Sequence, residues 1–425
     1  MDRSYHRLIP VLGILSLAAA ACGTSSSSTS GGASAASGNI SSCHGTITVS
    51  SDLPTSGGDA AIGGGTEKGV KLAVDQANST HMLGGCSIND IAKDDASAAK
   101  GKHDPQQGAQ NIQALVSNPA VVGIVGPFNS SVAVAELPIS NAAGIVQISP
   151  SNTDPGLTIP GSDPDINTAS LQPSGKITYF RVISNDVIQS QVMAQVAAKE
   201  KSLKNLYVID DQETYGKDLA NYFEQFFKQA GGKTTRTGLP GDTKDFRPVL
   251  TTAKGLGVDG VFFGGVASNG SGLIAAQMKE IGLNVPFLSG DGTVDPQYFK
   301  DGGPDGSLAS SAPDTTKLSS AQKFITDFKT AYNQDVVAYS TYGFDSMNIL
   351  LTAIRDAVVQ NGGQPIADPA AFRTAVIAKV AAIDYHGTIG ETKFDSRGDT
   401  LNHSFTVYSA TGGTWVGGET ISPSA

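Results

Sequence analysis

The sequence predicts an α/β protein built from two doubly wound lobes. Strand-like apolar runs alternate with helical segments twice along the chain, and such alternation indicates βαβ units and parallel sheets. The chain has 425 residues, which is enough for two domains of the usual ~100–200 residues. Hydrophobic residues make up 39% and charged residues 16% of it, a composition typical of a folded protein rather than of a disordered one.

The first alternating part lies before residue 150 and is followed by a long polar loop at 154–175. Its expected strands are 46–53, 87–92, 121–125 and 144–148, and its expected helices are 67–78, 105–116 and 131–141. In the second part we expect strands at 205–209, 233–239, 260–264 and 286–289, and helices at 189–199, 217–230, 248–256 and 272–281. Right-handed crossovers would place the helices of each part on the two faces of its sheet.

The alternation breaks in the last part of the chain. We expect helices at 318–332, 346–360 and 370–380, then strands at 388–394 and 404–408. A C-terminal part that returns to an earlier lobe would make the chain cross between lobes several times, as a multi-strand hinge. The predicted organisation is 43–182 with 311–393 as lobe 1, and 183–310 with 394–420 as lobe 2.

The first residues predict an export signal. Arg3 and Arg7 flank a polar start, residues 8–17 are mostly apolar, and small residues lead up to Cys22. This order is typical of a signal peptide, here 1–21, and the apolar stretch is shorter than the ~20 residues of a membrane span. The small residues resemble a bacterial lipobox, although Ala19 stands where that motif usually has leucine. We expect Cys22 to carry a lipid; the alternative is an ordinary cleaved signal with an incidental cysteine.

A flexible tether is predicted after the signal, at residues 22–42. The stretch that follows Cys22 is almost entirely Ser, Gly, Ala and Thr. Such a segment buries too little apolar surface to offset the entropy lost on ordering. A tether of this kind suits a folded body that stands off a membrane.

The two other cysteines predict a disulfide. The chain has 3 Cys, and Cys43 and Cys86 each precede or open an expected strand. Those two strands would be neighbours in an α/β sheet, and in an oxidising compartment two such cysteines pair. Two free thiols are the alternative.

Charge and motifs exclude several classes of function. The formal net charge is −10. The sequence shows no basic patch with interleaved aromatic residues, so we do not expect nucleic acid as a partner. The 6 His are scattered without metal-ligand spacing, and most are expected at the surface. Neither a Gly-x-Ser-x-Gly elbow nor a His-Glu-x-x-His motif is present. We therefore expect no catalytic residue, no metal and no cofactor.

The most informative segment is 148–153, where an apolar strand runs into a turn rich in hydroxyl and amide groups. Ser151, Asn152 and Thr153 offer hydrogen bonds but no strong base or nucleophile. Open α/β sheets bind ligands at the carboxyl ends of their strands, so the segment is equipped to hold an anion. An ordinary turn is the alternative, because these residue types dominate turns for backbone reasons.

Several short motifs, in this order and spacing, resemble the periplasmic leucine/isoleucine/valine-binding proteins, which are solute receptors of ABC importers. The motifs are Leu53-Pro54-Thr55-Ser56-Gly57, Lys93-Asp94-Asp95-Ala96-Ser97, Gly126-Pro127-Phe128-Asn129-Ser130-Ser131, Ile148-Ser149-Pro150-Ser151-Asn152-Thr153, Asp211-Gln212-Glu213-Thr214-Tyr215-Gly216, Gly290-Asp291-Gly292 and Tyr342-Gly343-Phe344-Asp345. The resemblance covers nearly the whole mature chain. It implies the type I periplasmic-binding fold, in which two Rossmann-like lobes close on a ligand.

The resemblance also implies which residues hold the carboxylate of an amino acid. Ser130 aligns with the family's serine after the Gly-Pro loop, and Ser151, Asn152 and Thr153 align with its second carboxylate-binding turn. Ser130 would lie at the start of a helix, where free N–H groups and the helix dipole favour an anion. A plain N-cap role for Ser130 is the alternative.

For the ligand's ammonium group the family has an acidic residue that aligns with Asp291. Tyr215 aligns with a tyrosine that reaches the ligand from the second lobe, and Tyr342 with another pocket aromatic. The alternatives are a solvated turn for Asp291, a rim aromatic for Tyr215 and a core position for Tyr342.

Two positions depart from the family pattern and change the expected side-chain pocket. Ile62 stands where some members have an aromatic residue, and Gly264-Gly265-Val266-Ala267 replaces a segment with a tyrosine. An amino acid remains the expected ligand class, but specificity for Leu, Ile or Val does not follow.

The implied protein captures a small solute between its lobes and docks on permease subunits of an ABC importer. We expect a monomer, anchored by lipid to the outer face of the bacterial cytoplasmic membrane. Alternatives are a ligand-sensing lipoprotein on the same fold, a binding protein for an amide, urea or carboxylate, and a secreted enzyme, for which the sequence offers little.

Overall fold

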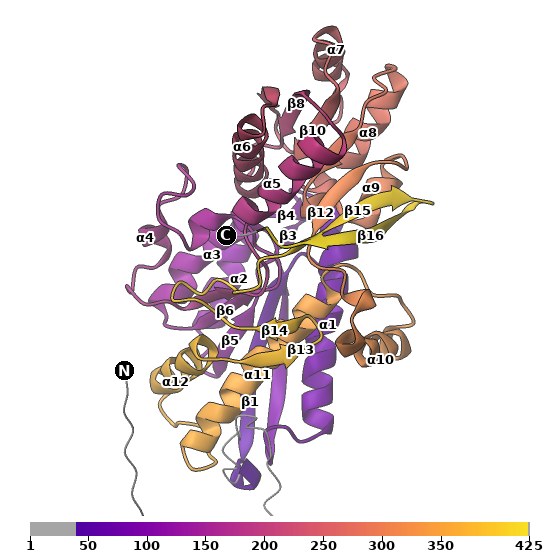
Figure 1. Cartoon of the computed structure of the whole chain (residues 1–425). Coiled ribbons are helices and arrows are strands. Elements are labelled where there is room, and N and C mark those ends of the chain that lie inside the picture. Colours follow the sequence, from indigo (N-terminus) through magenta and orange to yellow (C-terminus); the bar gives the residue numbers. More distant parts are fainter. Residues whose placement is uncertain (1–39, 424–425) are drawn as a thin grey trace, which may run out of the picture. The chain divides into compact units, whose positions relative to one another are not determined.

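The computed structural model describes residues 40–423, and two large sheets organise them. The predicted signal peptide, Cys22 and most of the predicted tether lie outside the described residues. We call the first sheet with its helices the first lobe, and the second sheet with its helices the second lobe (Figure 1). The residue boundaries of the lobes given above remain predictions. Among residues 40–423, no helix combines the length and the hydropathy needed to cross a bilayer.

The first sheet has the order β2-β1-β5-β6-β7, and all its strand pairs are parallel. Its strands are β1 (Gly45–Leu53), β2 (Cys86–Asp94), β5 (Val121–Val125), β6 (Val146–Ser149) and β7 (Tyr179–Arg181). The helices of this lobe are α1 (Ala60–Ser79), α2 (Pro105–Val116), α3 (Ser130–Ala142), α4 (Thr168–Leu171), α10 (Gln322–Tyr332), α11 (Ser340–Gln360) and α12 (Pro369–Ala381). Two hairpins, β3 (Ala96–Ser97) with β4 (Lys102–His103) and β13 (Tyr385–Gly387) with β14 (Gly390–Thr392), complete it.

Apolar side chains on both faces of the first sheet explain why helices pack on both of its faces. Val49 on one face shares a core with residues of α1 and α11, whereas Ile124 on the other face packs with α2 residues such as Ile112. A strand buried on both faces reads as a continuous apolar run, and every residue of β5 is buried. This is why 121–125 is predicted with the bounds that the structure has.

The second sheet has the order β16-β15-β12-β11-β10-β8-β9. Its strands are β8 (Asn205–Asp210), β9 (Lys233–Gly238), β10 (Gly260–Gly264), β11 (Phe287–Ser289), β12 (Leu308–Ser311), β15 (Phe405–Thr411) and β16 (Thr414–Ile421). Its helices are α5 (Asp186–Gln195), which continues as a π-helical turn over Val196–Glu200, α6 (Thr214–Gln229), α7 (Arg247–Gly255), α8 (Ser271–Glu280) and α9 (Pro296–Lys300). Successive strand residues point to opposite faces, so Phe262 packs with α6 while Val261 and Phe263 pack with α7 and α8.

The chain passes between the two sheets three times within residues 40–423: after β7, after β12 and before β15. The last passage brings β15 and β16, yellow in Figure 1, back to β12 as antiparallel strands. Crossings of this kind make a hinge of several strands, as the sequence predicts.

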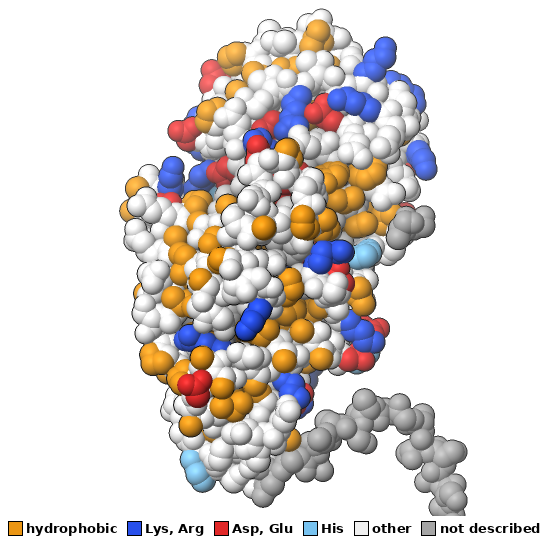
Figure 2. Space-filling model, turned by 90° about the vertical axis from the view of Figure 1, so that its left-hand side faces the viewer, with side chains coloured by type: hydrophobic (Ala, Val, Ile, Leu, Met, Phe, Trp, Pro, Cys, Tyr) orange, Lys and Arg blue, Asp and Glu red, His pale blue; other side chains and the backbone are white. Residues whose placement is uncertain are grey.

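Cys43 and Cys86 form a disulfide, which confirms the predicted pairing. They lie at the starts of β1 and β2, and these strands are parallel neighbours. On the face shown in Figure 2, positive and negative side chains are interspersed, and the view shows no separate basic patch.

Several elements differ from the sequence prediction. The loop 154–175 contains a 3₁₀ turn, Pro155–Leu157, and the short helix α4. The expected strand 388–394 is instead part of the β13–β14 hairpin, and β7, β12 and β16 are not predicted at all. A strand of three or four residues, such as β7 or β12, shows too little alternation to be recognised.

Candidate ligand-binding site

One cavity lies where strands of both sheets end, and most of the predicted site residues line it. Its free volume is about 20 Å³, room for roughly one water molecule. Its lining comes from the segments after β5, β6, β10 and β11 and from the start of α6: Phe128, Asn129, Ser130, Ser151, Thr153, Tyr215, Val266, Asp291 and Gly292. The carboxyl ends of parallel strands are where open α/β sheets bind ligands.

The first-lobe side of the cavity is the N-terminus of α3. Asn129 is the residue that precedes the helix, so Ser130 is its first residue and not its N-cap. The Asn129 side chain makes no capping hydrogen bond, and its Oδ1 is buried without a partner. The first N–H groups of a helix lack partners within it and attract anions. Asn129 was not singled out from the sequence, because its motif places it beside Ser130 without showing which way it faces.

The second polar turn, 149–154, is joined to the first by hydrogen bonds. Ser149 Oγ donates to the carbonyl of Pro127 over 2.8 Å and accepts from the backbone N–H of Asn152 over 2.9 Å. Ser151 Oγ and Asn152 Nδ2 both donate to the carbonyl of Phe128, over 2.9 and 2.8 Å. Ser151 and Asn152 therefore hold the two cavity loops together, and their proposed contact with a ligand stays a prediction.

A buried arginine donates hydrogen bonds to backbone carbonyls of this turn. Arg181 has no exposed surface, and its Nη1 donates to the carbonyls of Asn152 and Asp154 over 3.3 and 2.6 Å. Its Nε donates to Asp399 Oδ1 over 2.7 Å. Burial disfavours the charged guanidinium, but the adjacent Asp399 carboxylate raises the pKa of Arg181 overall.

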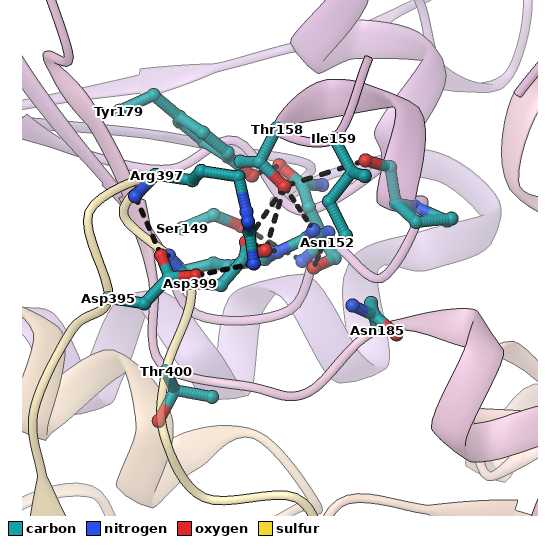
Figure 3. A network of polar contacts seen from close by, with 12 residues as sticks. Ser149, Asn152, Thr158, Ile159, Tyr179, Asn185, Asp395, Arg397, Asp399 and Thr400 are labelled. Atoms are coloured by element: carbon teal, nitrogen blue, oxygen red, sulfur yellow. Dashed lines mark hydrogen bonds and ion pairs between the residues drawn. The ribbon is translucent and has the colours of Figure 1, made fainter. Parts of the chain in front are cut away.

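Figure 3 shows how Thr158 and Asp399 point toward one another in this network. Thr158 Oγ1 lies 2.9 Å from Asp399 Oδ1, and Tyr179 donates its hydroxyl to Asn152 Oδ1 over 2.9 Å. The long loop 154–175 and the last interlobe crossing are thereby fixed to the turn that borders the cavity.

Asp291 lies at the second-lobe side of the cavity and is buried. Its Oδ1 accepts from Tyr215 and from Gln189 Nε2, each over 2.8 Å, and its Oδ2 accepts from Tyr339 over 2.7 Å. Burial raises the pKa of Asp291, and these three donors lower it in part. Among residues 40–423, no lysine, arginine or histidine forms an ion pair with it.

A second carboxylate lies close to Asp291. Asp186 is wholly buried and both its side-chain oxygens lack hydrogen-bond partners. Burial and then the neighbouring Asp291 raise its pKa well above the usual range. The second-lobe side of the site therefore holds two buried carboxyl groups that no described cation pairs.

Of the three apolar or aromatic residues predicted to line the side-chain pocket, one borders the cavity and two do not. Tyr215 lines the cavity, whereas Ile62 and Tyr342 do not. Tyr342 packs on the ring of Tyr339, with ring centroids 5.5 Å apart, and Tyr339 is the residue that reaches Asp291. Sequence reasoning missed Tyr339 because no motif surrounds it. The roles assigned to Ile62 and Tyr342 remain predictions.

A second contact joins the lobes beside the cavity. His103 Nδ1 lies 2.8 Å from Asp59 Oδ2 in the first lobe, and its Nε2 lies 2.7 Å from Glu213 Oε2 at the start of α6. Lys102 Nζ lies 2.7 Å from Glu213 Oε1 and also bonds Asn269. Although burial alone would raise the pKa of Glu213, His103 and Lys102 hold it below its usual range. The other described histidines, His44, His81, His386 and His403, are exposed, but His103 is buried.

The fold and the cavity between strand ends define a class of protein, a two-lobed α/β solute-binding protein. The sequence profile of the periplasmic binding protein family matches residues 46–414, and the chain belongs to that family. Members of this family bind solutes for ABC transporters outside the cytoplasm and are not enzymes. The expected family and fold are thus confirmed.

Individual relatives are distant but match over nearly their whole length. Leu/Ile/Val-binding protein homolog 3 of Brucella melitensis is 27% identical over 388 residues, which cover 89% of this chain and 95% of that protein. The leucine binding protein LivK of Thermotoga maritima is 23% identical with a TM-score of 0.76, over 89% of this chain and 99% of that one. An R. palustris ABC-transporter solute binding protein, solved with benzoate, is 21% identical with a TM-score of 0.72, over 89% and 97%. At these identities the two solved structures show the fold alone.

Proposed function

We propose that this chain captures a small amino acid between its lobes and delivers it to an ABC importer. The observation that carries the proposal is Asp291, a buried carboxylate without a cation, in the same cavity as the N-terminus of α3. A buried charge without a partner is costly, and a ligand ammonium group would supply that partner. The N–H groups at the start of α3, with the Ser130 hydroxyl, would bind the ligand carboxylate.

The two halves of the proposed clamp belong to different lobes. Ser130 and Thr153 follow strands of the first sheet, and Asp291 and Tyr215 belong to the second lobe. A ligand that touches both lobes binds the closed form better and shifts the population toward it. Tyr339 of the first lobe already donates to Asp291 of the second, so the described form resembles the closed one.

The cavity of the described form leaves little free space. Its volume of about 20 Å³ is far below the ~300–1,000 Å³ of most small-molecule sites, so a ligand would enter a more open form and be enclosed as the lobes close. Val266 is the aliphatic residue among the second-lobe lining residues. The relatives' names point to Leu, Ile and Val, whereas the volume of this cavity does not select among amino-acid side chains.

The cellular arrangement is also a proposal. After removal of 1–21, a lipid on Cys22 and the tether 22–42 would hold the monomeric binding protein at the outer face of the cytoplasmic membrane. The sequence around Cys22 supports this. The closed form would dock on the permease subunits.

Calorimetry with three matched ligands tests the proposal. Valine carries both charged groups, 3-methylbutanoate lacks the ammonium, and isobutylamine lacks the carboxylate. We expect only valine to bind measurably, because each analogue leaves one half of the clamp unpaired. Equal binding of valine and 3-methylbutanoate, or strong binding of benzoate instead, would show a receptor for simple carboxylates.

A further inference from the structure

Three buried carboxylates meet inside the first lobe, away from the cavity lining. Asp52 lies in β1, Asp95 follows β2 and Glu136 lies in α3, and each is wholly buried. One oxygen from each lies within 4.8 Å of the others. Like charges this close and this buried repel one another strongly in the low dielectric of a protein interior.

Both side-chain oxygens of Asp95 have no hydrogen-bond partner. The carboxyl groups of Asp52 and Glu136 lie within hydrogen-bonding reach of each other, so either a shared proton or a cation must join them. Among the ion pairs of residues 40–423, none involves these three carboxylates. Buried polar atoms are almost always partnered, so a concentration of such exceptions requires an explanation.

Gln147 supplies a separate observation that points to a ligand. It lies in β6 and is wholly buried, and its Nε2 donates to Glu136 Oε2. The end of its side chain therefore reaches into the cluster, but its Oε1 has no partner. A neutral amide oxygen has no proton to give, so it adds an acceptor to a group that lacks donors.

We propose that Asp52, Asp95, Glu136 and Gln147 form a binding site for a hard divalent cation, with Ca²⁺ the best match. Carboxylate and amide oxygens are the ligands that Ca²⁺ takes, at ~2.3–2.6 Å, so two ligands of one ion lie up to ~5 Å apart. The separation of 4.8 Å or less fits this limit. Mg²⁺ usually keeps several of its waters and binds through one or two carboxylates, whereas three buried carboxylates converge here. Asn111 donates to Asp52 Oδ1 over 2.9 Å and orients that carboxylate.

The ion would connect the elements that carry the cavity loops. Glu136 lies in α3, which begins at Ser130, and Gln147 lies in β6, which leads to Ser151. The backbone at Gly126 packs so closely on the carbonyl of Asp52 that a Cβ there would collide with it. A cation at this place would therefore stabilise the loop before α3 and the loop after β6, whichever ligand the cavity binds.

The test is thermal unfolding of the full protein after chelation with EDTA and dialysis, with and without added Ca²⁺, together with calorimetric titration of Ca²⁺. A ligand that binds the folded state raises the melting temperature. We expect Ca²⁺ to raise the Tm of the wild type, Mg²⁺ to raise it less, and Asp95→Asn and Glu136→Gln to abolish both the shift and the binding heat. Asp95→Asn breaks no hydrogen bond, because neither oxygen of Asp95 makes one.

Glu391→Gln is the matched control, because Glu391 belongs to an exposed group with Asp384 and His386. It should keep the full Ca²⁺ response. The competing explanation is that the acids share protons, since burial raises the pKa of Asp52 to about 7. A wild type indifferent to EDTA and Ca²⁺ overturns the proposal, even if the variants fail to fold. A Ca²⁺ shift that disappears in Glu391→Gln and persists in Glu136→Gln also overturns it.

Discussion

Tyr339 of the first lobe donates its hydroxyl to Asp291 of the second lobe over 2.7 Å. The carboxylate accepts two further hydrogen bonds within its own lobe, from Tyr215 and Gln189. Asp291 therefore has three of about four acceptor positions filled, and one remains for a ligand cation.

Asp291→Asn should weaken binding of a zwitterionic amino acid strongly, because it removes the charge that pairs with the ammonium group. Loss of one partner of a buried charge pair costs ~2–5 kcal/mol of binding free energy. Calorimetry measures it, with Asp245→Asn, an exposed second-lobe position, as the control. Unchanged affinity in Asp291→Asn would refute the assignment.

Binding should also depend on pH through Asp291. Burial raises the pKa of this carboxyl in the empty protein, and only its ionised form attracts an ammonium group. Affinity should therefore be full above that raised pKa and fall as the pH drops through it. A titration series of affinity against pH measures this, and Asp291→Asn should flatten the profile. A wild-type profile as flat as that of the variant would contradict the prediction.

The interlobe contact of His103 with Glu213 should favour closure. His103→Ala removes an ion pair between the lobes, although Lys102 keeps its own contact with Glu213, so the variant should shift the lobes toward the open form and weaken ligand affinity. Small-angle scattering should show a larger radius of gyration for ligand-free His103→Ala. His386→Ala is the control, since His386 is exposed and pairs with Asp384 in the first lobe. Identical scattering from wild type and His103→Ala would exclude this role.

Arg181→Met should destabilise the fold by ~3–5 kcal/mol, because Asp399 would remain buried without its partner. The double variant Arg181→Met with Asp399→Leu should recover part of that loss, as measured by denaturant unfolding in a double-mutant cycle. The loss of stability in Arg181→Lys should be smaller than that in Arg181→Met but not zero. Lysine keeps the positive charge, but it has no planar group that reaches Asp399 and the carbonyls of Asn152 and Asp154 together. Strict additivity of the two single changes would show that the pair is not coupled.

Reduction of the Cys43–Cys86 disulfide should lower the free energy of unfolding by about 4 kcal/mol, as loop-closure entropy predicts for a separation of 43 residues. Comparison of unfolding with and without a reductant measures this. Alanine at both cysteines should give the same loss and no further response to the reductant. An unchanged midpoint on reduction would contradict the expected contribution.

Two glycines of α1 should respond oppositely to alanine. A Cβ at Gly69 would collide with the carbonyl of Ser340 in α11, whereas one at Gly64 meets nothing closer than 4.0 Å. Gly69→Ala should cost ~1–3 kcal/mol of stability through overpacking. Gly64→Ala should add ~0.5–1 kcal/mol, because alanine loses less conformational freedom in a helix. Denaturant unfolding of the pair measures both signs.

The amino-acid sequence determined the α/β alternation, the pairing of the cysteines and the central strands. Residues 121–125 and 260–264 are predicted with the bounds of β5 and β10, because strands buried on both faces need continuous apolar runs that periodicity reveals. The motifs after β5, β6 and β11 also mark residues that the fold brings into one cavity, although what they bind there remains a proposal.

Only the tertiary structure decided which side chains complete the site. Tyr339 meets Asp291 across 48 residues, and His103 meets Glu213 across 110. The carboxylates of Asp52, Asp95 and Glu136 converge from three separate elements. Such contacts depend on how two sheets and their helices pack. Local propensity and spacing carry no record of that packing, because they describe neighbours along the chain and not neighbours in space.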